Sequence, residues 1–229
     1  MRLLGLGIVA AALIVSLPAQ ADTMCAPVGG TCVGTNTELF GSSASDLPHE
    51  TDDQSIFLDA ATGVTSFNGQ VGSQEGAPTA NFVMNQPVDV ANGFAGTTTP
   101  HGGTDATTLN FSIPGFQFGD FLFRTDLSNV TPLSMTVDVF SGSTLLDAFD
   151  INPADLKHDA DLDWKLLSLG ANDITSVALM SSGFEEVKQF EVSSVSEVPA
   201  PAALPLMFSG LTGLGWMLRK RRKPATVAA

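Results

Sequence analysis

Short runs of alternating apolar and polar residues recur through the middle of the chain, and they constrain its fold more than any other feature. The alternation is clear over residues 109–113, 133–139 and 189–192, and an apolar run from 174 to 180 continues the pattern. Successive side chains of a β-strand point to opposite faces, so such runs place one face on a core and the other in water. The pattern predicts an all-β chain.

Turn signals separate these runs. Asn68-Gly69, Asn92-Gly93, His101-Gly102-Gly103 and Ser182-Gly183 are sequences typical of turns. The segment from Val137 through Ser141-Gly142-Ser143 to Phe149 has the form of a β-hairpin. The expected strands are therefore short and connected antiparallel to one another.

Three further segments complete the expected architecture. Apolar residues change parity between 116–118 and 121–123, which predicts a β-bulge at Gly119-Asp120. Residues 153–157 are the best candidate for a short helix, and residues 22–54 look less regular, as an edge strand with a long loop or a partly disordered segment. The fold class predicted for residues 22–197 is an antiparallel β-sandwich, jelly-roll-like in topology. An immunoglobulin-like sandwich is the alternative, but both cysteines lie at the start of the chain, outside the Cys–Trp–Cys pattern of that fold.

Charge is distributed very unevenly along the 229 residues. All 24 acidic residues lie between Asp22 and Glu197, where only four basic residues accompany them, so this region carries a net charge of −20 although the whole chain carries −14. Nucleic-acid binding depends on neutralising phosphates with Lys and Arg. The charge balance therefore argues against a nucleic-acid partner.

The N-terminus has the three parts of a secretory signal. Arg2 supplies a positive charge, residues 3–17 form a short apolar helix candidate, and Pro18-Ala19-Gln20-Ala21 places small residues before Asp22. Residues 1–21 are therefore expected to be a signal peptide that signal peptidase removes after Ala21. An uncleaved anchor or a buried helix is the alternative.

The two cysteines, Cys25 and Cys32, are separated by Ala-Pro-Val-Gly-Gly-Thr. Export to an oxidising compartment favours a disulfide between them, because proline and glycine let the chain turn back over this distance. Free thiols and a two-ligand metal site are the alternatives, and no histidine lies nearby to help hold a metal.

The C-terminus combines a proline box, an apolar segment and a basic cluster. Residues 198–218 are uncharged, and the cluster Arg219, Lys220, Arg221, Arg222 and Lys223 follows them directly. A helix of this length can just cross a bilayer, with the basic cluster on the cytoplasmic side. The segment is thus expected to be a transmembrane helix, with residues 224–229 as a cytoplasmic tail.

This C-terminus resembles the PEP-CTERM sorting domain, the segment that exosortases recognise in Gram-negative bacteria. The resemblance covers residues 198–223 and includes a Pro-x-Pro box at Pro199, Ala200 and Pro201, with alanine where that family usually has glutamate. It implies that an exosortase cuts the chain near this box during a transient stay in the inner membrane. The body would then be released to the cell surface or to an extracellular polysaccharide matrix. A plain single-pass anchor is the alternative.

The densest acidic cluster contains Asp159, Asp161 and Asp163. Aspartates at alternate positions can supply oxygen ligands to Ca²⁺, but an EF-hand loop starting at Asp159 would need glycine and glutamate where Trp164 and Gly170 stand. One interpretation of the cluster is a solvated acidic loop, and the alternative is an irregular calcium site. No other cofactor is expected.

Trp164 follows this cluster and is the one polar aromatic residue of the body. With Asp161 and Asp163 it forms the local arrangement that sequence offers for contact with a glycan, and the alternative is a tryptophan at the edge of the core. The three histidines, His49, His101 and His158, are far apart and lack zinc spacing.

We therefore expect an exported structural or binding protein of the cell surface or matrix, without catalytic activity of its own. A carbohydrate-binding or adhesive jelly roll, assisted by calcium, is the alternative. A secreted hydrolase would need a catalytic triad assembled from distant residues.

Overall fold

The computed structural model describes residues 23–26, 28, 30–42, 47, 52–91, 93–96, 105–157, 160–170 and 173–199. The expected signal peptide, most of the expected sorting segment and the C-terminal tail lie outside these residues. Within the described part of the chain, no helix is both long enough and apolar enough to cross a membrane.

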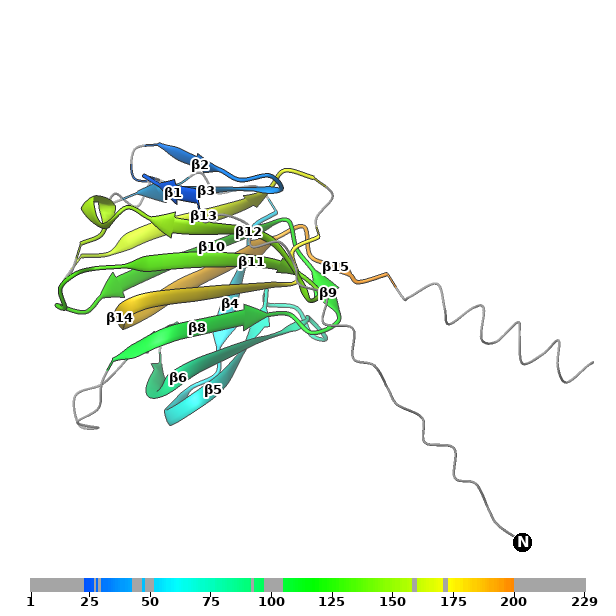
Figure 1. The fold of residues 1–229 in the computed structure, drawn as a ribbon. Coiled ribbons are helices and arrows are strands. Elements are labelled where there is room, and N and C mark those ends of the chain that lie inside the picture. Colours follow the sequence, from blue (N-terminus) through cyan, green and yellow to red (C-terminus); the bar gives the residue numbers. More distant parts are fainter. Residues whose placement is uncertain are drawn as a thin grey trace, which may run out of the picture.

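Fifteen strands and one short 3₁₀ helix make up the described fold (Figure 1). They are β1 (Thr23–Cys25), β2 (Thr31–Val33), β3 (Thr37–Ser42), β4 (Gln54–Leu58), β5 (Ala61–Val71), β6 (Thr79–Ala91), β7 (Phe94–Gly96), β8 (Ala106–Ser112), β9 (Phe116–Gln117), β10 (Asp120–Leu127), β11 (Met135–Ser141), β12 (Thr144–Ile151), η1 (Pro153–Asp155), β13 (Leu162–Ser168), β14 (Ser176–Ser193) and β15 (Ser196–Glu197).

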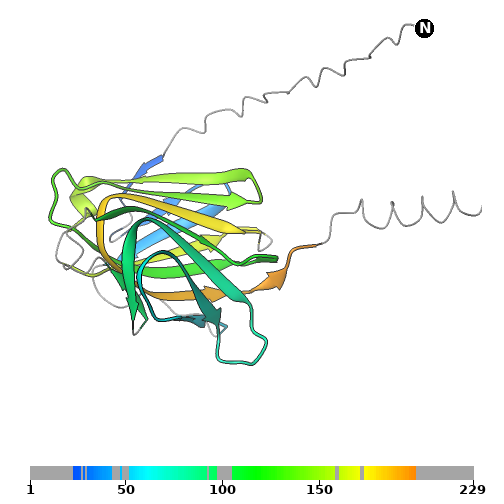
Figure 2. The ribbon, with the colours of Figure 1, turned by 90° about the horizontal axis from the view of Figure 1, so that it is seen from below.

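The strands form two packed layers that share β14 (Figures 1 and 2). One layer runs β1–β12–β11–β14–β8–β6, and the other runs β2–β3–β13–β10–β14–β4–β5. The pairing of β5 with β6 joins the two layers a second time. The first half of β14 pairs with β8 and β11, and its second half pairs with β10, β7 and β4. All of these pairings are antiparallel except that of β1 with β12. The predicted all-β, antiparallel sandwich is thereby confirmed.

Aromatic side chains fill the space between the layers. Phe82 of β6 and Phe111 of β8 meet Phe190 and Phe121 from the opposite layer, with ring centroids 4.6 Å apart for Phe82–Phe190 and 4.2 Å for Phe111–Phe121. All four side chains are at most 1% exposed. Each such ring pair adds about 0.5–1.5 kcal/mol beyond the burial of its area. The apolar positions of the alternating segments therefore form the core, as the sequence pattern predicts.

Two local predictions are confirmed. The hairpin of β11 and β12 turns at Gly142, whose φ of 58° favours glycine. The helix near residue 153 is the short η1. The bulge predicted at Gly119-Asp120 is wrong: β9 ends before these residues and β10 begins at Asp120, and the nearest register shift of β10 lies between Leu122 and Arg124.

Two predicted turns are wrong. Asn68-Gly69 lies inside β5, where Gly69 lets β4 pack closely: a Cβ there would stand 2.6 Å from Cγ2 of Ile56. Ser182-Gly183 lies inside β14, at a shift of register where that strand passes from one layer to the other. In both cases glycine serves close approach or bending within a strand rather than chain reversal.

Candidate functional site

The predicted disulfide between Cys25 and Cys32 is present, with the two Cα atoms 5.5 Å apart. It joins β1, which pairs with β12, to β2, which pairs with β3. These strands belong to different layers, so the disulfide ties the layers together at one edge of the sandwich. It stabilises the fold and offers no chemistry for a ligand.

Trp164 lies in the core rather than on the surface. Its side chain is 0% exposed, its indole Nε1–H donates to Oγ1 of Thr125 at 2.8 Å, and its ring stacks against Phe123 with centroids 6.5 Å apart. A ring without a free face cannot stack on a sugar. Trp164 is therefore not the glycan-binding residue that the sequence offered, and the core interpretation holds.

Asp161 and Asp163 are engaged by cations from two neighbouring strands. Both carboxylate oxygens of Asp163 accept hydrogen bonds from Arg124, at 2.5 and 3.0 Å, and Oδ1 of Asp161 lies 2.9 Å from Nζ of Lys188. The hydrogen bond that Arg124 donates to Asp163 raises the pKa of Arg124. Burial lowers the pKa of Lys188, but hydrogen bonds to Asp161 and Glu186 outweigh it, so the net pKa is raised.

Within the described residues, this charge network occupies the two aspartates of the predicted calcium site, Asp161 and Asp163. The described residues contain no group of three His, Cys, Asp or Glu side chains that could hold a metal ion. Asp159, together with the three histidines, lies outside the described residues. The two described aspartates carry structural ion pairs between β10, β13 and β14.

The predicted sorting box begins where the last strand ends. β15 pairs with β9, and the backbone N–H of Val198 donates to the carbonyl of Gly115 at 2.9 Å. Pro199 follows directly, whereas Ala200, Pro201 and the basic cluster 219–223 lie outside the described residues. The hydrogen bonding of the last strand thus extends to Val198, directly before the predicted box.

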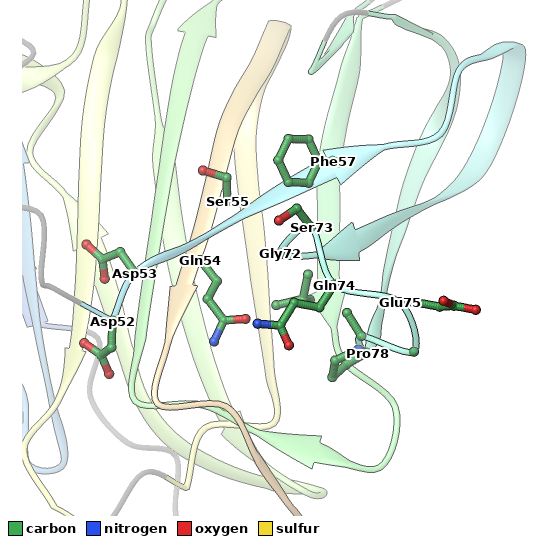
Figure 3. Close-up of a pocket in the computed structure, with 13 residues that line it drawn as sticks. Asp52, Asp53, Gln54, Ser55, Phe57, Gly72, Ser73, Gln74, Glu75 and Pro78 are labelled. Atoms are coloured by element: carbon green, nitrogen blue, oxygen red, sulfur yellow. The ribbon is translucent and has the colours of Figure 1, made fainter.

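Two open hollows flank β4 on the surface of the sandwich. The first, of about 680 Å³, lies between β4 and the loop that joins β5 to β6 (Figure 3). The second, of about 630 Å³, lies between β4 and the second half of β14. Ser55 and Phe57 line both hollows, so the outer face of β4 is the ridge between them.

Phe57 is the most conspicuous side chain of this ridge, because 55% of it is exposed. Its strand neighbour Ile56 points inward and is 5% exposed, as the alternation of a strand requires. Beside Phe57, the hydroxyl of Ser55 donates to Oε1 of Glu191 at 3.3 Å, and Nε2 of Gln70 donates to the carbonyl of Gln74 at 2.8 Å. The exposed ring of Phe57 thus lies beside polar groups that are held by hydrogen bonds.

The walls of the hollows are polar and acidic. In Figure 3, Gln54 and Gln74 point toward one another across the first hollow. Asp52, Asp53 and Glu75 line this hollow and Glu191 lines the second, and none of the described lining residues is lysine or arginine. The arrangement can donate and accept hydrogen bonds, and its carboxylates favour neutral or cationic ligands over anionic ones.

The sequence gives little indication of this site. Phe57 is followed by Leu58, and a lone phenylalanine in an apolar run is read as core. The register of β4 determines that Ile56 faces inward and Phe57 faces the solvent. This register follows from the pairing of β4 with β5 and β14.

Comparison of the chain with protein-family models, curated proteins and solved structures finds no match.

Proposed function

We propose that this chain is an exported protein of a Gram-negative bacterium, processed by signal peptidase and by an exosortase, whose β-sandwich has a structural or binding role at the cell surface or in the extracellular matrix. The observation that carries the export step is the disulfide between Cys25 and Cys32. Stable disulfides are typical of proteins outside the cytoplasm.

The position of the folded unit between the two expected cleavage points supports the same itinerary. β1 begins at Thr23, just after the expected cut behind Ala21, and β15 ends at Glu197, just before the Pro-x-Pro box. Both cuts would leave every described strand intact. The mature sandwich would keep its acidic character and lose the cationic cluster 219–223.

We also propose the finer topology, a jelly-roll-like sandwich, which the passage of β14 between the two layers supports. A carbohydrate-binding role remains the second candidate. Trp164 no longer supports it, but the exposed ring of Phe57 beside two polar hollows does.

Replacing both Pro199 and Pro201 with alanine tests the sorting step. The double variant should accumulate in the membrane fraction as a longer precursor, whereas a Pro205→Ala variant, altered outside the box, should be released like the unaltered protein. Immunoblots of membrane and extracellular fractions provide the readout. Equal release of the double variant would contradict processing at the Pro-x-Pro box.

A further inference from the structure

We propose that the outer face of β4 is a binding site for an extended, neutral polysaccharide, with the ring of Phe57 stacked on one sugar and the two hollows holding its neighbours. This names a ligand for the binding role in the proposed function and rests on that role. The site is distinct from the Trp164 region, and it is built from β4, the loop after β5 and the second half of β14.

The shape of the surface indicates an extended ligand. Because Ser55 and Phe57 line both hollows, the hollows adjoin at these residues, and a molecule that fills both passes beside Phe57. A small metabolite would occupy one hollow and leave the ring exposed. A chain of sugar units can occupy both and cover the ring between them.

The ring itself matches the apolar face of a sugar. Large aromatic residues contribute most when their area is removed from water, and more than half of Phe57 is exposed. The axial C–H groups of a pyranose form a flat apolar face of similar size. Stacking the two removes apolar area from water on both partners.

The polar neighbours match sugar hydroxyls. A sugar hydroxyl both donates and accepts hydrogen bonds, and the side-chain amides of Gln54, Gln74 and Gln189 do the same. Ser73 adds a hydroxyl to the first hollow. A mixture of amides, hydroxyls and carboxylates around an exposed ring offers each hydroxyl a partner.

The charge of the walls selects neutral chains. Asp52, Asp53, Glu75 and Glu191 line the hollows without a lysine or arginine among the described lining residues. A polymer of uronic acids or sulfated sugars would bring like charges against these carboxylates, which costs affinity. These carboxylates therefore disfavour an anionic polymer, and among uncharged and anionic sugars the expected ligand is an uncharged chain.

Backbone strain marks the same place. Gln189 has a φ of 53°, in the left-handed region that residues other than glycine rarely adopt. It lies on β14 between the segment that pairs with β7 and the segment that pairs with β4, and it lines the second hollow. Strained conformations persist where the surrounding structure imposes them, and they cluster at ligand sites.

Calorimetric titration of the exported protein with cellohexaose, mannohexaose and xylohexaose tests the proposal, with an oligogalacturonate of equal length as the anionic probe. We expect at least one neutral hexasaccharide to bind and the anionic probe to bind far more weakly. Phe57→Ala should weaken binding about tenfold, and Phe57→Trp should retain it. Leu169→Ala, which removes another exposed apolar side chain, should leave affinity unchanged.

Gln74→Ala provides a second variant on the exposed loop, and it should weaken binding with no change in melting temperature. The proposal is overturned if none of the three neutral hexasaccharides binds, or if Phe57→Ala binds them with unchanged affinity. Equal affinity for the oligogalacturonate, or binding of oligolysine in place of the sugars, would also overturn it. These results are independent of tail processing, so failure here is distinguishable from failure of the sorting proposal.

Discussion

Asp147 of β12 offers the sharpest test of how the two layers are held together at the edge near the disulfide. Its Oδ1 accepts a hydrogen bond from the backbone N–H of Thr35 at 2.8 Å. Its Oδ2 accepts from the backbone N–H groups of Asn36 and Thr37, at 2.8 and 2.7 Å, and from Oγ1 of Thr37 at 2.9 Å. The carboxylate therefore fastens the turn between β2 and β3 to a strand of the other layer.

The cost of removing this carboxylate follows from which donors water can reach afterwards. Thr35 is exposed and Asn36 partly so, and both N–H groups can turn to water, whereas Thr37 is 0% exposed. Asp147→Ala leaves two buried donors of Thr37 without an acceptor, each costing about 1–3 kcal/mol, so we expect a loss of about 4 kcal/mol. Asp147→Asn keeps one carbonyl oxygen for Thr37 and should cost about 1–2 kcal/mol.

Urea unfolding, followed by the fluorescence of the buried Trp164, measures both losses. Asp150→Asn on the same strand is the matched control, because Asp150 faces the outside of the sandwich and is only partly buried. It should change the free energy of unfolding by less than about 0.5 kcal/mol. If Asp147→Ala costs no more than this control, the carboxylate does not hold the layers, and the reasoning is refuted.

Three further variants test other parts of the fold. Cys25→Ser should lower the free energy of unfolding by about 2.5 kcal/mol in urea titrations, the loop-closure value for so short a loop, and equal stability of the oxidised protein and the variant would contradict this. Against the effect of burial, hydrogen bonds to Asp161 and Glu186 raise the pKa of Lys188 in the folded protein. The stabilisation from these bonds is fully present below the pKa of an unfolded-state lysine, about 10.4, and is lost as the pH rises through the pKa of the folded state. The gap in unfolding free energy between the unaltered protein and Lys188→Gln should therefore stay constant from neutral pH to about 10 and shrink above it; a gap that does not shrink would count against the ion pairs. Gly69→Ala should cost about 1–3 kcal/mol in chemical unfolding, because its Cβ would stand 2.6 Å from Ile56, while Gly170→Ala, with open space around it, should be near neutral.

The strand pattern could be predicted from sequence where alternation alone decides the outcome. Residues 106–112 and 135–149 show this, because one face of each strand meets the aromatic core and the other meets water. The region from β4 to β7 was not predicted as strands. There Gly69 and Gly72 look like loop residues, yet they allow close packing and a left-handed bend beside Gln54.

The candidate sites show a different limit. Asp161 and Asp163 resemble metal ligands in sequence, and only the fold brings Arg124 and Lys188 beside them from strands far along the chain. Trp164 is buried and Phe57 is exposed for a related reason. Strand register decides which aromatic ring faces the core, and register depends on partners that one strand's sequence does not name.

The disulfide is the one expected site feature that local sequence could supply. Cys25 and Cys32 lie close together in the chain, and the intervening Pro and Gly residues permit a tight turn. Long-range pairing was not needed to anticipate it. Its consequence, the joining of β1 and β2 from different layers, was visible only in the fold.

Mass spectrometry of the mature protein, isolated from the surface or matrix of its producing bacterium, tests the export and sorting account most directly. The account predicts an N-terminus at Asp22 and a C-terminus near Pro199–Pro201, with residues 219–223 absent. A surface-located protein that retains the intact cluster Arg219–Lys223 would contradict it.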